Sequence, residues 1–408
     1  MSNWLVISVI LLGLYAALRI LLGIFFANVY ELRTLKLQKR TAKPAQHHSF
    51  SILIPAYNEG KSIRDSVLSA LELDYDNFEV IVINDGSHDD TLNQLRALQL
   101  KYPNLVIADQ ANGGKSVALN NALINYAQYE LIMVLDADSV LSADALTKMN
   151  RYFQDRRVLA AAANVRIKQA PHFIEYVQRV EYFVGYYLKN SEIPLNMEYI
   201  IGGIGSCFRR DCLLQAGGYD SDTVTEDIDL TMKLLAYYGN TAYKFVYAND
   251  VIAYTPAVHT FHELLNQRLR WKYGRFKALI KYRTMIFNLN PKYSLSLSFW
   301  KLPKIWLEEF LMFLEPGFIF LALFCLVRYG DFSTYISLVL LYGAYASFAV
   351  LNADKLTLKE KGIFFLTAPM AFLFLEVVSL VDYLSLLRCL IHQDAIFKQE
   401  SSWEHVER

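Results

Sequence analysis

The sequence predicts an α/β domain with a mostly parallel sheet, flanked at both ends by membrane-spanning helices. Short apolar runs of strand length alternate with helical patterns between residues 50 and 163, as in sheets covered by helices on both faces. Hydrophobic residues make up 54% of the 408-residue chain, against roughly 45–50% in ordinary domains, and the excess lies near the two ends. These observations favour a sheet domain held at a membrane.

The first predicted element is a transmembrane helix within residues 1–30. Residues 4–27 are apolar apart from Arg19. As a helix that rises about 1.5 Å per residue, this segment is long enough to cross about 30 Å of hydrocarbon. A cleaved signal peptide would carry its positive charge before the apolar run, whereas here a basic linker follows it at 31–49. The positive-inside rule then places the N-terminus outside and the following region in the cytoplasm.

The central region, 50–255, reads as the α/β domain. Strands are expected at 50–55, 78–83, 105–108, 131–135, 158–163, 241–247 and 251–254. Helices are expected at 61–72, 89–100, 115–126, 173–189 and in the Leu-rich pattern that begins after residue 225. Ligands of such sheets collect at the carboxyl ends of the strands, so side chains that follow strands are the first candidates for a site.

The C-terminal region is predicted to return to the membrane. Residues 256–309 contain a long basic helix at 259–282 and a segment with tryptophans and lysines, which is typical of a helix on the membrane surface. Three further spans are expected within 310–391, followed by a tail at 392–408. The prediction is a multi-pass protein of the cell inner (plasma) membrane with a cytoplasmic catalytic domain and an external C-terminus.

Composition and missing motifs exclude several classes of protein. The formal net charge is zero, so nothing indicates a nucleic-acid partner. The four cysteines form no C-x-x-C pair, which argues against a zinc site or a disulfide framework. The first strand is not followed by G-x-G-x-x-G, and the Gly113–Ser116 segment lacks the first glycine of a phosphate-binding G-x-x-x-x-G-K-[ST] loop. A dinucleotide-dependent dehydrogenase or a nucleotide triphosphatase is therefore not favoured.

Acidic side chains follow predicted strand ends at several points along the chain. Asp85 ends the second strand in Ile-Asn-Asp-Gly-Ser, and Asp136-Ala137-Asp138 follows the fourth. A third group, Thr225-Glu226-Asp227, opens a helix, and alone it would be only an N-cap with acidic residues in the first turn.

Together these groups suit the transfer of a sugar from a nucleotide. Two carboxylates one residue apart can hold Mg²⁺ or Mn²⁺ against phosphates, because hard cations take oxygen ligands. Another carboxylate can accept the proton of an acceptor hydroxyl, and cationic groups can cover the departing diphosphate.

The motifs and their order resemble those of a processive family 2 glycosyltransferase with the GT-A fold, a Rossmann-like α/β architecture. The motifs are PAYNE at 55–59, NDGS at 84–87, NGGKSVALN at 112–120, DAD at 136–138, FRR at 208–210, TED at 225–227 and QRLRW at 267–271. Within the family the resemblance is greatest to bacterial poly-β-1,6-N-acetylglucosamine synthases. Two stretches depart from the expected pattern: Lys-Tyr-Gly-Arg follows Trp271 where Ala-Gln-Gly-Gly is expected, and 202–206 is unusually rich in glycine.

The resemblance implies a UDP-sugar donor and a divalent cation. The residues implied for the nucleotide sugar are Pro55, Tyr57, Glu59, Asp85, Lys115 and Asp136, with Tyr57, Glu59 and Asp85 at the uridine. Asp138, with Asp136 beside it, would hold Mg²⁺ or Mn²⁺. Two simpler roles stay open: Glu59 as part of a helix cap, and Lys115 as a solvated lysine at a helix start.

The resemblance also implies an acceptor side, occupied by a growing glycan. Asp227 would be the general base, Glu226 would help to position the acceptor, and the product would be inverted from an α-linked donor to a β-linkage. The QRLRW residues Gln267, Arg268, Arg270 and Trp271 would contact the diphosphate and the acceptor. Trp271 as core packing or as an interfacial anchor is the simpler alternative.

Three functions remain open from the sequence. The first is a synthase that polymerises and exports a β-linked polysaccharide, poly-N-acetylglucosamine or alternatively a product of the cellulose, chitin or hyaluronan type. Membrane lipids would surround it, and a small accessory subunit and cyclic-di-GMP are further partners to be tested. The second is a transferase that adds one sugar to a membrane lipid. The third is a non-catalytic scaffold, which is disfavoured because Asp138 and Asp227 are both present.

Overall fold

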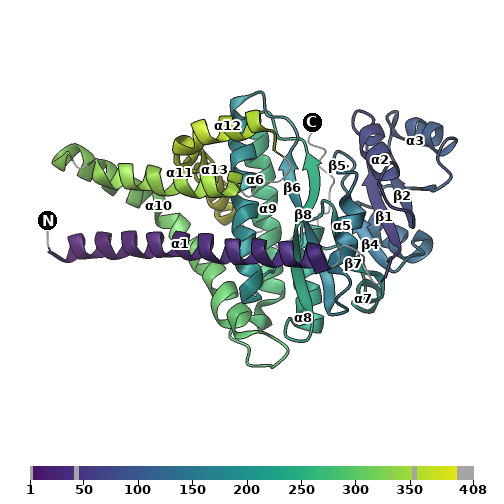
Figure 1. The fold of residues 1–408 in the computed structure, drawn as a ribbon, viewed down its shortest axis with the longest axis horizontal. Helices are drawn as coiled ribbons and strands as arrows, with labels where there is room; N and C mark the ends of the chain where they lie inside the picture. Colours follow the sequence, from purple (N-terminus) through teal and green to yellow (C-terminus); the bar gives the residue numbers. More distant parts are fainter. Residues whose placement is uncertain (1–2, 41–45, 331, 352–355, 393–408) are drawn as a thin grey trace.

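The structure is a computed structural model, and it describes residues 3–40, 46–330, 332–351 and 356–392. Residues 41–45 of the predicted linker and all of the predicted tail except His392 lie outside this part of the chain. A twisted sheet with helices against its faces forms the body of the molecule, and long helices project from one side of it (Figure 1).

The sheet has the strand order β3-β2-β1-β4-β7-β6-β8-β5. Its strands are β1 (Phe50–Ala56), β2 (Phe78–Asp85), β3 (Leu105–Gln110), β4 (Leu131–Val134), β5 (Val140–Leu141), β6 (Val158–Ile167), β7 (Ser206–Arg209) and β8 (Lys244–Thr255). All run parallel except β7 and β5, which are antiparallel to their neighbours. In β1, Phe50 is level with Phe78 of β2 and with Leu131 of β4. The carboxyl ends of these three strands therefore emerge at one edge.

Helices cover both faces of the sheet. The helices are α1 (Asn3–Arg40), α2 (Ile63–Leu71), α3 (Thr91–Gln99), α4 (Lys115–Asn121), α5 (Ala145–Tyr152), α6 (Phe173–Glu192), α7 (Arg210–Gln215), α8 (Glu226–Tyr238), α9 (Phe261–Lys281), α10 (Leu302–Tyr329), α11 (Ser333–Leu351), α12 (Leu358–Thr367) and α13 (Ala371–Ile391). Shorter helical turns span Ala122–Tyr126, Ile193–Leu195, Arg283–Met285, Ser296–Lys301 and Ala368–Met370.

The apolar strands are buried on both faces because successive side chains point in opposite directions. Leu53 and Ile81 pack into the core that contains α4 and α8, whereas Ile52 and Val80 pack into the opposite core, beneath α2, α3 and α5. This explains why the strand segments read as continuous apolar runs.

The structure corrects several predicted boundaries. The two strands expected at 241–247 and 251–254 form the single strand β8, which carries a bulge where the pairing with β6 shifts between Ala163 and Asn164. Strands β5 and β7 were not predicted, because two- and four-residue strands leave too short a pattern to recognise. Helix α10 runs through Pro316 and joins a predicted surface helix to the first predicted C-terminal span.

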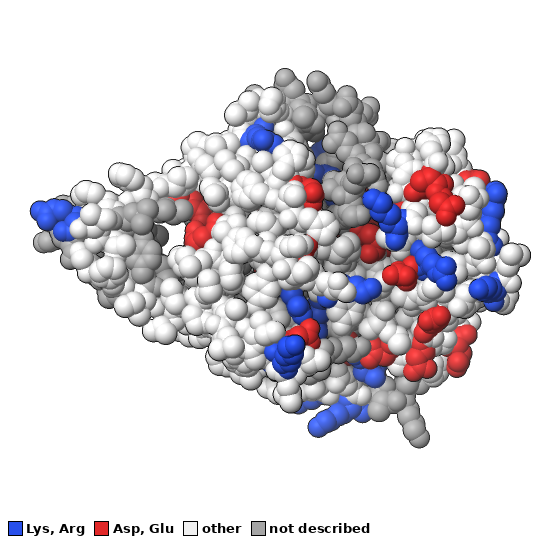
Figure 2. All heavy atoms as spheres, turned by 90° about the horizontal axis from the view of Figure 1, so that it is seen from above, with Lys and Arg blue, Asp and Glu red and all other residues white. Residues whose placement is uncertain are grey.

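Among the described residues, one helical segment, Leu358–Ile391, is long and apolar enough to cross a membrane. It comprises α12, a short turn and α13, and it contains the last predicted span. The other predicted spans coincide with the helices α1, α10 and α11, whose insertion in a membrane remains a prediction. Charged side chains gather over the sheet domain, while the projecting end is largely free of them on the face shown in Figure 2, except at its tip.

Helix α8, whose first turn carries Glu226 and Asp227, is held at its far end by a close backbone contact. Gly239 ends the helix with φ +71°, and a Cβ added there would lie 2.2 Å from the Lys292 carbonyl oxygen. Only glycine fits this position without moving one of the two segments.

We therefore expect Gly239→Ala to lower the free energy of unfolding by about 2 to 4 kcal/mol, from left-handed strain plus the backbone clash. Gly185→Ala in α6 is the matched control, since its added Cβ meets no atom within 4 Å and alanine favours a helix. Unfolding of the detergent-solubilised proteins measures both, and equal stability of Gly239→Ala and wild type would contradict the expectation.

Candidate active site

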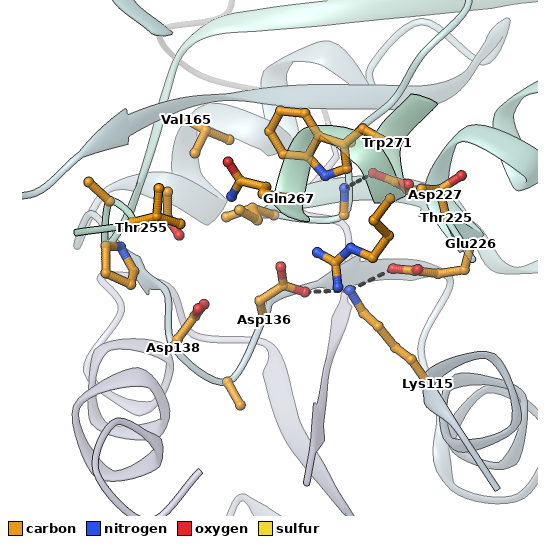
Figure 3. Close-up of a pocket in the computed structure, with 18 of the residues that line it drawn as sticks. Lys115, Asp136, Asp138, Val165, Thr225, Glu226, Asp227, Thr255, Gln267 and Trp271 are labelled. Carbon is orange, nitrogen blue, oxygen red and sulfur yellow. Dashed lines mark hydrogen bonds and ion pairs between the residues drawn. The ribbon is translucent and has the colours of Figure 1, made fainter. Parts of the chain in front are cut away.

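A large cleft of about 1760 Å³ lies at the carboxyl edge of the sheet (Figure 3). Most of the predicted site residues line it: Pro55, Glu59, Lys115, Asp136, Asp138, Glu226, Asp227, Gln267, Arg270 and Trp271. They come from β1, α4, α8 and α9 and from the loops that follow β1 and β4. The parallel strands thus bring together segments that are more than 200 residues apart.

Asp85 is completely buried behind the loop that precedes α4. Its carboxylate accepts hydrogen bonds from the backbone N–H groups of Gly113 and Gly114, each at 2.9 Å, and from the Gln110 amide at 2.7 Å. In this structure the carboxylate therefore supports the glycine loop, and a contact with uridine remains a prediction.

The PAYNE segment leaves β1 in a sharp turn. Asn58 has φ +54°, and its side-chain oxygen accepts a hydrogen bond from the His88 backbone N–H at 2.8 Å. Glu59 accepts a hydrogen bond from the Ser62 hydroxyl at 2.6 Å, at the start of α2, and Tyr57 is half-buried beside it. Glu59 thus contacts Ser62, the N-cap residue of α2, and both its role in the cap and its contact with uridine remain predictions.

Lys115 joins two acidic motifs. Its ammonium lies 2.7 Å from Asp136 Oδ1 and 2.5 Å from Glu226 Oε1 (Figure 3). Burial alone would lower the pKa of this lysine, but the two carboxylates raise it above its ordinary value. Lys115 is thus a permanently charged group held in ion pairs, and it is not a solvated lysine.

Asp227 occupies the first turn of α8. One carboxylate oxygen accepts from the Ile228 backbone N–H at 2.8 Å, and the other accepts from the Gly203 backbone N–H at 3.1 Å. Burial and the neighbouring Glu226 carboxylate raise the pKa of Asp227 to about 6, although Lys115 and the hydrogen bond from Ile228 oppose this shift. The group is therefore ionised near neutral pH but more basic than an ordinary aspartate.

The glycine-rich loop at 202–206 passes directly over these groups. A Cβ on Gly203 would lie 3.5 Å from both Glu226 Oε1 and Lys115 Nζ, and one on Gly202 would lie 3.9 Å from Asp227 Oδ2. The departure from the expected pattern thus falls at the lysine–carboxylate cluster.

The QRLRW residues on α9 divide into two sets. Arg270 and Trp271 face the cleft, with Arg270 exposed. Arg268 is buried, pairs with Glu181 of α6, and stacks over the Trp271 ring at 4.6 Å. Arg268 therefore supports Trp271 from behind, and its contact with a ligand remains a prediction.

Gln267 lines the cleft while its side-chain oxygen accepts a hydrogen bond from the Gln178 amide at 2.9 Å. Gln178 in turn accepts from the Val258 backbone N–H at 2.9 Å, so α6 holds both the start of the motif and the segment before α9. Gln178 and Glu181 were not among the residues predicted from the sequence. Their i, i+3 spacing, which puts both on one face of a helix, was the available signal.

The Asp136 and Asp138 side chains both line the cleft. Within the described ranges, no group of three or more His, Cys, Asp or Glu side chains is placed to hold a metal ion. A pair of carboxylates fits Mg²⁺ or Mn²⁺, since such ions commonly complete their coordination with substrate phosphates and water. These residues are the ones that would hold the cation.

Comparison with known proteins decides the class of enzyme. Residues 47–274 match the model of the family described as "Glycosyltransferase like family 2". The chain belongs to this glycosyltransferase family. Enzymes of this family transfer sugars. The cleft at the carboxyl edge of the sheet is the candidate active site of this chain.

The curated relatives include poly-β-1,6-N-acetyl-D-glucosamine synthases. The chain is 31% identical to that of Staphylococcus epidermidis over 239 residues, covering 58% of this chain and 57% of the relative. It is 29% identical to that of Staphylococcus aureus (strain COL) over 278 residues, covering 67% and 66%. Each match spans less than two thirds of the relative's length.

Among solved structures, the fold is similar to that of a mannosyltransferase from Pyrobaculum calidifontis in complex with GDP-mannose and Mn²⁺. The TM-score is 0.54 at 18% identity, with 92% of this chain and 98% of the other covered. The similarity establishes the GT-A-like architecture of the mixed, mostly parallel sheet, as the sequence predicted.

Helix α9 reaches the start of α8 through a glycine. A Cβ added to Gly274 would lie 1.9 Å from Thr225 Oγ1 and 2.6 Å from Thr225 Cβ, so any larger residue must push the two helices apart. Thr225 immediately precedes Glu226 and Asp227, which would move with it.

We expect Gly274→Ala to lower kcat by about 100-fold, because a displacement of about 1 Å has an effect of that size on reacting groups. Thr225→Gly is the control, since it removes the clashing side chain and glycine is tolerated at a helix N-cap. Steady-state kinetics of Gly274→Ala, Thr225→Gly and the double variant measure the effect. A double variant as slow as Gly274→Ala would contradict steric displacement.

Proposed function

We propose that the chain is a membrane-embedded, inverting glycosyltransferase. It would synthesise poly-β-N-acetylglucosamine from UDP-N-acetylglucosamine and help to export the polymer. One observation carries the proposal: a half-buried carboxylate of raised pKa, Asp227, shares a cleft with the Asp136–Asp138 pair and the Arg270–Trp271 side chains. The similarity to poly-β-1,6-N-acetyl-D-glucosamine synthases supports the choice of sugar.

The proposed reaction is a single in-line displacement. An acceptor hydroxyl oxygen bonds to the anomeric carbon of the donor sugar while the bond to UDP breaks, and the hydroxyl proton passes to Asp227. A general base works best with a pKa near the working pH, and a value of about 6 suits this role. Glu226, held by Lys115, would position the acceptor without taking its proton.

The remaining side chains would bind and orient the donor. Asp138 and Asp136 would hold Mg²⁺ or Mn²⁺, which neutralises charge on the diphosphate when bound. Pro55, Tyr57, Glu59 and Asp85 would form the nucleoside side of the cleft, with Asp85 acting through the glycine loop that it supports. Arg270 would cover the departing diphosphate, and Trp271 would pack against the acceptor sugar.

Exposed apolar side chains on the projecting helices support embedding in a membrane. Soluble monomers rarely expose apolar patches larger than a few hundred Å². The apolar side chains that are more than half exposed on these helices include Leu18, Leu21, Phe25, Phe310, Phe320, Val327, Ile336 and Leu340. We propose that α1, α10, α11 and the α12–α13 segment are the spans of a multi-pass protein whose catalytic domain is cytoplasmic.

Replacing the proposed base should separate activity from stability. Asp227→Asn should abolish transfer while UDP binding, followed by calorimetry, remains. For the wild type, kcat should fall as pH drops through about 6, because Asp227 is then protonated.

The stability of the folded protein depends on pH in the opposite direction to kcat: the Asp227 carboxyl lowers stability as pH rises. A carboxyl whose pKa rises from 3.8 to about 6 on folding destabilises the folded protein increasingly between those pH values and fully above them. Asp227→Asn should therefore have the higher Tm at pH 7.5 and no advantage at pH 4. Near-wild-type turnover of this variant would show that Asp227 is not the base.

Product size tests the function as a whole. Membranes containing the protein receive UDP-N-acetylglucosamine or UDP-glucose with Mg²⁺ or Mn²⁺, and membranes with Asp227→Asn serve as the blank. We expect alkali-stable polymer of high mass from the first donor, and loss of product in excess EDTA or with Asp138→Ala. A small organic-soluble glycoside would instead identify a lipid-acceptor transferase, and full activity in EDTA would refute the metal assignment.

A further inference from the structure

The helix that carries Arg270 and Trp271, α9, is also clamped by a buried carboxylate of α10, which pairs with Lys272 and with the cleft-lining Arg275. Glu309, in α10, places one oxygen 2.5 Å from the Lys272 ammonium and the other 3.2 Å from the Arg275 guanidinium. Lys272 is 3% exposed and Glu309 7% exposed. One carboxylate thus bridges two cations that lie about one turn apart on α9.

Both cations stand where this chain departs from the expected family pattern. Lys272 and Arg275 occupy positions at which the pattern has alanine and glycine, while Gly274 matches it.

The ion pairs with Glu309 and the contacts with the cleft alternate along residues 271–275 of α9. Trp271 lines the cleft, Lys272 meets Glu309, Gly274 touches Thr225, and Arg275 meets Glu309 again. A helix moves as a rigid rod over such a short length. Any shift of α9 along α10 must therefore move Trp271 in the cleft and press on Thr225, which precedes the proposed base.

We propose that Glu309 is a positioning residue: through Lys272 and Arg275 it sets the place of α9, and hence of Arg270, Trp271 and the Thr225–Asp227 turn. The assignment rests on the proposed function, because it assumes that this cleft performs the transfer. A buried ion pair contributes little net stability compared with apolar packing, but it fixes a geometry sharply, which is the property required here.

The neighbouring Glu308 is a matched control. It lies one residue away on α10 and is 43% exposed at its side chain, where it pairs with Lys304 at 3.0 Å and Arg19 at 3.5 Å. Glu308→Gln therefore removes the same charge from the same helix without touching α9.

The experiment compares Glu309→Gln, Glu309→Asp and Glu308→Gln in membranes, with UDP-N-acetylglucosamine as the probe donor. We expect Glu309→Gln to lower kcat by about 10- to 100-fold and to change donor KM less, since Arg270 is the one side chain proposed for the donor that lies on α9. Glu308→Gln should match wild type.

Removal of one partner from a buried pair can itself unfold a protein, so Glu309→Asp provides a second test. It keeps the charge but shortens the side chain by one methylene, and it should fold with a wild-type Tm and a reduced kcat. A folded Glu309→Gln or Glu309→Asp with wild-type kcat would overturn the proposal.

The two proposals fail in different ways. The rate of the wild type with this donor tests the proposed function, whereas the ratio of each variant to wild type tests the positioning role. If wild type uses a different donor, the same ratios are measured with that donor, and the prediction for Glu309 is unchanged.

Discussion

The two ion pairs of Lys115 hold the candidate active site together. The lysine begins α4, and it binds Asp136 at the end of β4 and Glu226 at the start of α8. It therefore joins the part of the cleft proposed for the donor to the part proposed for the acceptor. Two carboxylates this close would repel each other strongly without a cation between them, especially at a site shielded from water. The position of α8, and therefore of Asp227, depends on Lys115 neutralising the repulsion between Asp136 and Glu226.

The electrostatics of Asp227 follow from the same arrangement. Its burial and the nearby Glu226 raise the pKa, while Lys115 limits the rise to about 6. A carboxylate without the lysine would be more basic but would also be protonated over more of the neutral range. The proposed base would thus be ionised near neutral pH and more basic than an ordinary aspartate, at a cost in stability that the packing of α8 on the sheet and on α9 offsets.

Much of the fold and the candidate site was predictable from local patterns. The parallel strands β1 to β4, their helices and the acidic groups at their ends follow from short apolar runs with polar side chains after them. The short strands β5 and β7, the single strand β8 and the continuity of α10 through Pro316 were not predictable. Their pairing or packing depends on partners distant in sequence, and these outweigh weak local preferences.

The sequence by itself determined the class of enzyme, the sheet and the residue types available for chemistry, because periodicity and ordered motifs are local properties of the chain. Only the tertiary structure decided how those residues are used. Asp85 supports a loop, Arg268 supports Trp271, and Glu309 reaches two cations on another helix. Such roles depend on which side chains meet in space, and the free energies of burial and ion pairing that select those contacts are set by the whole fold.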